Sequence, residues 1–337
     1  MNEFALKLRK TLARPIPLSV FFVTVTILYS LLLWQNSSKP GTQDPPELKK
    51  IPEVKLLRTN EYELIKPVLF AEIAIESSEF KQLKCQLSFM ITEKKKDGSI
   101  RSADIFLRRL DDGKWMNCGD DMPFPAGSLL KVPIMMTWLK MAENDPGLLE
   151  RKIFFAQPPG IIPGQTFGGR SIIPGREYAV SELLEYLIEE SDNNATWLLA
   201  QQMNLPLFQQ LFTDLGLEKP DRGNSNYALS ARDYSKFMVV LYNSSYLIPK
   251  YSQHALKLLT KCTFNKGMTR KLPADLLVAH KFGEQSEFPD SDLSESGIVY
   301  SKDKTYLVTI MTRGENMDLL SDLISDLSHE IYQSFNP

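Results

Sequence analysis

The chain has 337 residues, a length that allows one large domain or two smaller ones. Its 43% hydrophobic, 10% aromatic and 24% charged residues exclude a wholly disordered chain, a collagen-like fibre and a multi-span membrane protein. A formal net charge of −2, three histidines and three cysteines give no basis for nucleic-acid binding, an imidazole-based metal site or a disulfide-dense scaffold.

The N-terminal residues carry the pattern of a membrane anchor. Residues 1–14 contain several basic side chains against a single acid, and the stretch from Ile16 to Trp34 has no charge. About 20 apolar residues in a helix cross a bilayer core of roughly 30 Å. The basic flank predicts that the N-terminus stays in the cytoplasm and the rest is exported. We therefore predict a cytoplasmic tail over 1–14 and a transmembrane signal-anchor over 15–34, with a cleaved signal peptide as the alternative.

A polar linker is predicted to follow this segment. Residues 35–60 are rich in Pro, Ser, Lys and Asp, a composition typical of a solvated tether. The remaining residues, 61–337, are long enough for one large domain with a sizeable core.

Strands are predicted at both ends of this domain and helices in its middle. A β-rich stretch over 84–93 predicts the first strand. Further strands are expected over 103–110, 114–118, 277–281, 296–300 and 305–312. The predicted helices cover 128–144, 180–190, 194–203, 205–215, 231–242 and 317–335. This order indicates one α+β domain in which both ends complete an antiparallel sheet and a helical lobe is inserted between them.

A serine and a lysine open the first predicted helix. Ser128 and Lys131 are three residues apart, so on a helix they share a face. A serine hydroxyl becomes a good nucleophile when an adjacent base takes its proton, and a lysine kept neutral by burial can serve as that base. Two other Ser-x-x-Lys phrases, at 78–81 and 301–304, lie in charged or polar surroundings. Only Ser128 follows a Pro-Ala-Gly turn and opens an apolar helix.

Two further phrases follow along the chain. Ser191, Asp192 and Asn193 close the predicted helix 180–190, and taken alone they read as an ordinary helix cap or turn. Lys281-Phe282-Gly283 lies on a predicted strand, where a lone lysine usually faces solvent.

The three phrases together resemble the penicillin-recognising serine hydrolases, and most of all the class A β-lactamase family. The resemblance extends to residues 182–200, to Arg232-Asp233 and to the strand at 297–300, and it covers about 80–335. It implies the β-lactamase/transpeptidase-like fold for the exported domain.

The resemblance also implies a role for each matching residue. Ser128 would be the acylated nucleophile, Lys131 its general base, and Ser191 a proton relay toward the leaving group. Asn193 would hold a substrate amide carbonyl. Lys281 would add positive charge for Ser191 and for a substrate carboxylate.

The implied oxyanion hole consists of the backbone N–H groups of Ser128 and of Glu284, which follows Gly283. No cofactor or metal is implied. The expected partner is a small-molecule β-lactam or a peptidoglycan peptide, met on the outer face of a bacterial cytoplasmic membrane, in the periplasm or the extracellular space.

The sequence departs from the family at three places. No Glu-x-x-Leu-Asn phrase, which carries the base for deacylation, occurs between residues 193 and 232, and Glu218 is the only glutamate there. Phe282 replaces the hydroxyl residue that grips a substrate carboxylate. No arginine lies at 294–296, so Arg313 on the neighbouring strand is the candidate carboxylate anchor.

These observations predict a serine hydrolase that acts through a Ser128 acyl-enzyme on a β-lactam or a D-Ala-type cell-wall peptide amide, as a β-lactamase or a D-Ala-D-Ala carboxypeptidase does. The alternatives are a non-hydrolytic penicillin-binding sensor or degenerate family member, and a scaffold in which the motif residues only cap and pack.

Overall fold

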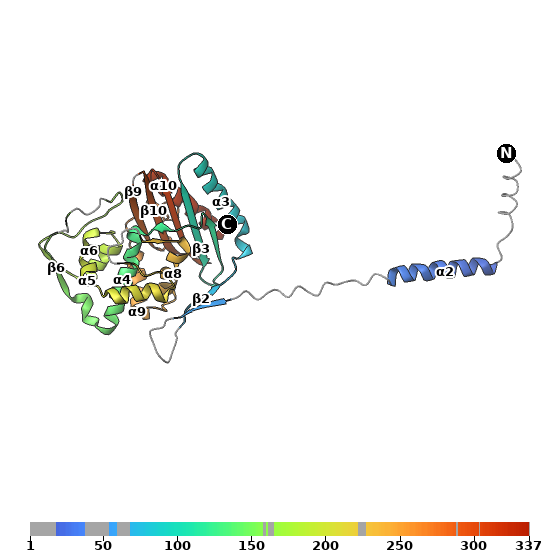
Figure 1. Ribbon diagram of the computed structural model, residues 1–337, viewed down its shortest axis with the longest axis horizontal. Coiled ribbons are helices and arrows are strands. Elements are labelled where there is room, and N and C mark those ends of the chain that lie inside the picture. Colours follow the sequence, from blue (N-terminus) through green and yellow to red (C-terminus); the bar gives the residue numbers. More distant parts are fainter. Residues whose placement is uncertain are drawn as a thin grey trace. The chain divides into compact units, whose positions relative to one another are not determined.

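The structure is a computed structural model, and the chain divides into two units, residues 1–51 and 52–337. It describes residues 18–37, 54–58, 68–157, 160, 165–221, 227–287, 289–302 and 304–336 (Figure 1).

In the first unit, the described residues form one helix, α2 (Leu18–Ser37). Within the described part of the chain, no helix combines the length and apolar character that crossing a membrane requires, so the span predicted over 15–34 gains no support here. The predicted tail, 1–14, lies outside the described residues. Of the predicted linker, 35–60, the part Val54–Arg58 forms a strand, β1, in the second unit.

A five-stranded antiparallel sheet forms the centre of the second unit. Its strand order is β4-β3-β11-β10-β9, so the early strands join the late ones through the pairing of β3 with β11. The strands are β3 (Ser102–Arg109), β4 (Trp115–Gly119), β9 (Val278–Glu287), β10 (Asp290–Tyr300) and β11 (Thr305–Gly314). The predicted α+β arrangement, with a sheet completed by both ends of the domain, is confirmed.

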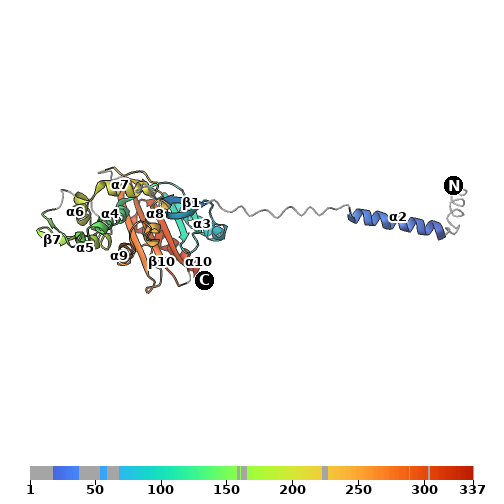
Figure 2. The ribbon, with the colours of Figure 1, turned by 90° about the horizontal axis from the view of Figure 1, so that it is seen from below.

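Apolar residues on alternating strand positions supply a core on each side of this sheet. On one side, α3 (Lys81–Lys96) and α10 (Met317–Phe335) pack against residues such as Ile105 and Val308. On the other side, Phe106, Leu307 and Met311 join the core of the helical lobe. Figure 2 shows the sheet between α10 and the helices of this lobe.

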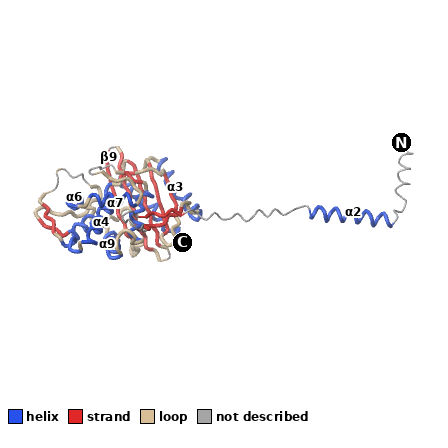
Figure 3. The backbone as a smooth tube through the Cα atoms, turned by 60° about the horizontal axis from the view of Figure 1, so that its bottom comes forward, coloured by secondary structure: helices blue, strands red, loops and turns tan. Residues whose placement is uncertain are grey.

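The helical lobe gathers to one side of the strands, as the blue segments of Figure 3 show. Its helices are α4 (Lys131–Asn144), α5 (Val180–Ile188), α6 (Asn193–Gln202), α7 (Leu205–Asp214), α8 (Ala231–Tyr242) and α9 (Pro249–Leu259). The short 3₁₀-helices are η1 (Ser78–Phe80), η2 (Gly127–Leu130) and η3 (Pro146–Glu150). Three two-stranded sheets pair β1 with β2 (Val68–Ile73), β5 (Phe124–Pro125) with β8 (Ala228–Leu229), and β6 (Lys152–Phe155) with β7 (Arg176–Ala179).

The strand predicted over 84–93 is wrong, because these residues belong to helix α3. Leu83, Leu87 and Ile91 recur every four residues and are buried, which is the spacing of one helical face. The β-rich composition that suggested a strand includes Cys85 and Phe89, and both are exposed.

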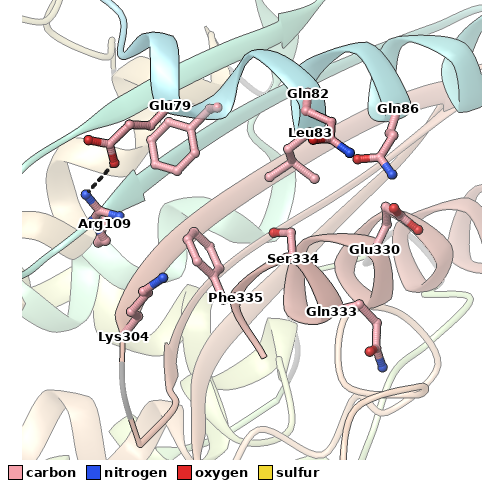
Figure 4. Close-up of a pocket in the computed structure, with 11 residues that line it drawn as sticks. Glu79, Gln82, Leu83, Gln86, Arg109, Lys304, Glu330, Gln333, Ser334 and Phe335 are labelled. Carbon is pink, nitrogen blue, oxygen red and sulfur yellow. Dashed lines mark hydrogen bonds and ion pairs between the residues drawn. The ribbon is translucent and has the colours of Figure 1, made fainter. Parts of the chain in front are cut away.

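A surface pocket lies between α3 and α10, away from the predicted catalytic residues. Figure 4 shows Gln82 and Gln86 of α3 opposite Glu330 of α10, with the Phe335 ring beside Lys304. Its lining is mostly polar, and none of the predicted site residues contributes to it.

Asp104 of β3 is a buried carboxylate outside the predicted site. Its Oδ1 accepts hydrogen bonds from Asn117 Nδ2 at 3.2 Å and from the Asp121 N–H at 3.3 Å. Burial raises the pKa of Asp104 to about 6, although these hydrogen bonds pull it down. The folded domain therefore holds a proton that the unfolded chain releases near pH 4.

The Asp104 carboxyl makes stability depend on pH with a definite sign. Because its folded pKa is raised, its stabilising effect is present below about pH 4 and is lost as the pH rises through about 6. Two pKa units correspond to about 3 kcal/mol. We therefore expect the free energy of unfolding of Asp104→Asn, relative to that of wild type, to increase by up to that amount between pH 4 and pH 7. Urea unfolding followed by circular dichroism measures this difference. Asp275→Asn, the same charge change at an exposed residue, should show no such gain.

Candidate active site

The predicted nucleophile lies in a turn that packs against the free edge of the sheet. Ser128 is in η2, and β9 is the edge strand beside it. Gly127 has φ +49°, and a Cβ there would meet the Glu284 carbonyl oxygen at 2.7 Å. A Cβ on Gly283 would meet the Ala126 carbonyl oxygen at 2.7 Å. The two glycines thus let the backbones of residues 127 and 284 approach closely.

Ser128 is partly exposed. Among the described residues its hydroxyl has no hydrogen-bond partner, and the Ser128 carbonyl accepts from the Lys131 N–H at the start of α4. The predicted nucleophile is therefore accessible, one turn before the predicted base.

Lys131 contacts two other residues of the predicted site. Its Nζ donates to Ser191 Oγ at 3.0 Å, to Asn193 Oδ1 at 2.8 Å and to the Ser191 carbonyl oxygen. The lysine side chain is buried, with 3% of the residue exposed. Burial lowers the pKa of Lys131 well below its usual value, and the nearby charge of Lys281 lowers it further. Burial thus favours the neutral form of this amine, which can accept a proton, more than in an exposed lysine.

The loop between α5 and α6 presents Ser191 and Asn193 to this lysine. Ser191 is fully buried with φ +55°, a strained conformation for a serine. Asp192 is the N-cap of α6 and accepts from the N–H groups of Asn194 and Ala195 at 3.0 and 3.1 Å. The capping interpretation is therefore correct for Asp192, while its two neighbours turn toward Lys131.

Lys281 reaches the same serine from β9. Its Nζ donates to Ser191 Oγ at 2.9 Å and to the Phe282 carbonyl oxygen at 2.9 Å, and it lies 4.1 Å from the centre of the Phe282 ring. Burial lowers the pKa of Lys281 to about 8, while nearby Glu295 and Glu284 partly oppose that shift. Ser191 Oγ therefore lies between two buried lysines whose pKa values are both lowered by burial.

Gln165 is a site residue that the sequence analysis did not single out. Its Nε2 donates to the Ser191 carbonyl oxygen at 2.8 Å and to Asn193 Oδ1 at 3.3 Å. It lies in a long Pro- and Gly-rich loop with no local pattern that marks it. Only the fold brings it to the site.

The candidates for the missing deacylation base and for the carboxylate anchor make their contacts outside this site. Glu218 is exposed, and its backbone carbonyl accepts from the Tyr227 hydroxyl at 2.6 Å. Residues 222–226, part of the segment searched for a deacylation base, lie outside the described residues. Arg313, the candidate carboxylate anchor, donates instead to Asp292 Oδ1 at 2.8 Å and lies over the ring of Phe124.

Behind β9, His280 Nδ1 and Glu295 Oε1 are 2.7 Å apart, and Glu295 Oε2 accepts from the Met268 N–H at 2.7 Å. In the described part of the chain, no group of three or more His, Cys, Asp or Glu residues is arranged to hold a metal ion.

The contact between β9 and η2 yields a direct test. We expect Gly283→Ala to push the edge strand away from the turn, because its Cβ would meet backbone atoms of Ala126 and Leu129 at 2.7 and 2.8 Å. A displacement of this kind in a catalytic site costs about 100-fold in rate. Acylation of Ser128, followed by intact mass, should slow accordingly. In the control Gly147→Ala, in η3, the added Cβ meets only Asp145 Oδ1, at 3.6 Å, so acylation should stay close to wild type.

Comparisons with known proteins bear on the family and the fold of this chain. The model of the beta-lactamase enzyme family matches residues 86–335. The structure of PBP-A has a TM-score of 0.65 at 24% identity, covering 76% of this chain and 96% of its own. A beta-lactamase from Chitinophaga pinensis has a TM-score of 0.64 at 18% identity, covering 77% of this chain and 100% of its own. An ancestral class A beta-lactamase has a TM-score of 0.63 at 21% identity, covering 74% of this chain and 100% of its own.

No curated protein matches the chain by sequence. The structural similarities, all below 25% identity, establish the β-lactamase-like fold, and the family model matches well over half of the chain. The chain therefore belongs to the beta-lactamase enzyme family.

Proposed function

We propose that this domain is a serine hydrolase that forms an acyl-enzyme on Ser128 with β-lactams or with D-Ala-type cell-wall peptide amides. The observation that carries the proposal is the buried Lys131, which has a lowered pKa, contacts Ser191 and Asn193, and lies one turn after Ser128. A PBP-A mutant has been solved as an acyl-enzyme complex with penicillin G, which supports the choice of a β-lactam as the first ligand to test.

The proposed acylation begins when Ser128 Oγ attacks the substrate carbonyl carbon and its proton passes to the neutral Lys131 Nζ. The N–H groups of Ser128 and Glu284 would stabilise the negative oxygen that develops, and such donors contribute a few kcal/mol each. The C–N bond then breaks, and Ser191, held by both lysines, delivers its proton to the leaving nitrogen and takes in return the proton that Lys131 received from Ser128.

A specific observation favours a second candidate, a penicillin-binding sensor that does not release its product. Glu218, the glutamate present where the family carries its deacylation base, is exposed and linked to Tyr227. Acylation without a base that activates water would leave a long-lived adduct.

One experiment separates the two candidates. The full chain is incubated with a fluorescent penicillin, and its intact mass is followed over time. A transient adduct with released product supports hydrolysis, and a lasting adduct supports the sensor. Under either candidate function, the Ser128→Ala variant should form no adduct. The absence of an adduct with several β-lactams and with a D-Ala-D-Ala peptide would refute the proposal.

We also propose, from the sequence alone, that the domain is held at the outer face of a bacterial cytoplasmic membrane by the uncharged stretch from Ile16 to Trp34. Separation of cell membranes from soluble material, followed by protease treatment of intact spheroplasts, tests this. Recovery of the full-length chain in the soluble cytoplasmic fraction would contradict it.

A further inference from the structure

Among the described residues, three oxygen atoms accept hydrogen bonds from the Lys131 amine, and each of them has a second donor. Lys131 Nζ donates to the Ser191 carbonyl oxygen, to Ser191 Oγ at 3.0 Å and to Asn193 Oδ1 at 2.8 Å. Lys281 Nζ also donates to Ser191 Oγ, at 2.9 Å. Gln165 Nε2 donates to the Ser191 carbonyl oxygen at 2.8 Å and to Asn193 Oδ1 at 3.3 Å. The Gln165 amide therefore duplicates two of the three hydrogen bonds of Lys131.

The number of N–H groups on the Lys131 amine decides how many of these bonds it can make. A lysine ammonium has three N–H groups and no lone pair, so it can donate to all three oxygens at once. A neutral amine has two N–H groups, and its lone pair is what accepts the serine proton in the proposed acylation. One oxygen must then lose its bond to Lys131. Because a buried acceptor without a donor is unfavourable, a second donor on that oxygen favours the neutral amine.

The Gln165 side chain is held in place by the loop around it. A Cβ on Gly168 would meet Gln165 Oε1 at 2.9 Å, so the loop packs closely against the amide. Phe167 donates its N–H to Glu284 Oε1 at 3.3 Å, and its ring centre lies 5.1 Å from that of Phe264. The segment is thus attached to β9 and to the loop after α9, and it presents the amide N–H groups to the turn between α5 and α6.

Charged groups act on Lys131 in both directions. Burial lowers the pKa of Lys131 most, and the charge of Lys281 on β9 lowers it further. Asp192 at the start of α6 and Glu284 on β9 raise this pKa. Gln165 carries no charge, but its Nε2 binds two of the oxygens that the amine binds. The positive end of the amide dipole therefore lies near the amine, which also disfavours the charged form of Lys131.

We propose that Gln165 is a positioning residue for the general base. By holding two of the oxygens that Lys131 binds, it lets the amine give up one N–H and keep its lone pair free for the Ser128 proton. Without the amide, these oxygens would depend on Lys131 alone and would favour its charged form. This inference rests on the proposed Ser128 acylation and adds a residue that supports its base.

The test compares wild type with Gln165→Met, whose side chain has a similar length and no N–H donor. Rate constants for adduct formation between the full chain and a fluorescent penicillin are measured by intact mass between about pH 5 and 10. The midpoint at which the rate rises with pH should move to higher pH by about one unit in Gln165→Met. The reason is that a hydrogen bond from a charged donor is stronger than one from a neutral donor by about that amount.

A second measurement follows the Lys131 amine without acylation. The Cε resonance of Lys131 is recorded by NMR in the full chain with isotopically labelled lysine, and it is assigned by its absence in Lys131→Met. Its titration midpoint should rise by the same amount in Gln165→Met. It should rise further in Gln165→Glu, which also lacks the N–H donors and adds a negative charge beside the amine.

Gln209→Met is the matched control. Gln209 lies in α7, and its Nε2 donates to the Pro220 carbonyl oxygen at 3.1 Å, so the substitution removes the same kind of hydrogen bond elsewhere in the helical lobe. Both midpoints should stay at their wild-type values in this variant.

Three results would overturn the inference. The first is a Lys131 midpoint that Gln165→Met leaves unchanged or lowers. The second is a rate that falls equally at every pH in Gln165→Met, which would give Gln165 a purely structural role. The third is a shift in Gln165→Glu alone, which would report only the added charge. If no β-lactam acylates Ser128, the proposed function fails, whereas the NMR titration still shows whether Gln165 favours the neutral amine.

Discussion

Replacement of Lys131 by methionine is expected to reduce Ser128 acylation by about 100- to 10,000-fold, the range that a positioned general base contributes. The lysine is buried next to Ser191 and has a lowered pKa, so it is the group best placed to take the Ser128 proton. Methionine has a similar volume and cannot accept that proton. The rate of adduct formation with a fluorescent penicillin measures the loss.

The same substitution should leave the fold intact, because every acceptor that loses Lys131 retains another donor. Gln165 still donates to the Ser191 carbonyl and to Asn193 Oδ1, and Lys281 still donates to Ser191 Oγ. Removal of a buried amine also relieves a desolvation cost. We therefore expect a thermal midpoint close to that of wild type. Wild-type acylation rates in a folded Lys131→Met variant would remove this lysine from the mechanism.

The architecture was largely predictable from the sequence because its main signals are local. Short apolar runs, such as Ile105–Leu107 in β3 and Tyr306–Val308 in β11, marked strands, and the helical period marked α8 and α10. The error at residues 84–93 arose because the stretch was taken as a strand from its β-rich residue types. Burial of Leu83, Leu87 and Ile91 against the sheet selects the helix, and that packing lies outside any local window.

The separate parts of the candidate site were also visible in the sequence, but their connections were not. Ser128, Ser191 and Lys281 come from three distant segments, and each phrase alone has an ordinary structural explanation. Gln165, the hydrogen bonds of the Glu284 side chain and the pairing of Arg313 with Asp292 all depend on how loops and strands meet in space. No periodicity or spacing records such contacts.

The two lysines should give acylation a bell-shaped pH dependence. The rate should rise with pH as Lys131 loses its proton. The midpoint of this rise should lie well below the usual pKa of a lysine, because burial and the charge of Lys281 lower the pKa of Lys131. The rate should fall again as Lys281 loses its charge, with an alkaline midpoint near pH 8, because burial lowers the pKa of Lys281 to about 8.

A variant separates the two limbs. In Lys281→Met the alkaline limb should disappear, because no titrating amine remains beside Ser191 on β9. The acid limb should move to higher pH, because the cation that lowers the pKa of Lys131 is gone. Rate constants for adduct formation between about pH 5 and 10 measure both changes. An alkaline limb that persists in Lys281→Met would assign it to another group. An acid limb that does not move would mean that Lys281 exerts no electrostatic effect on the base.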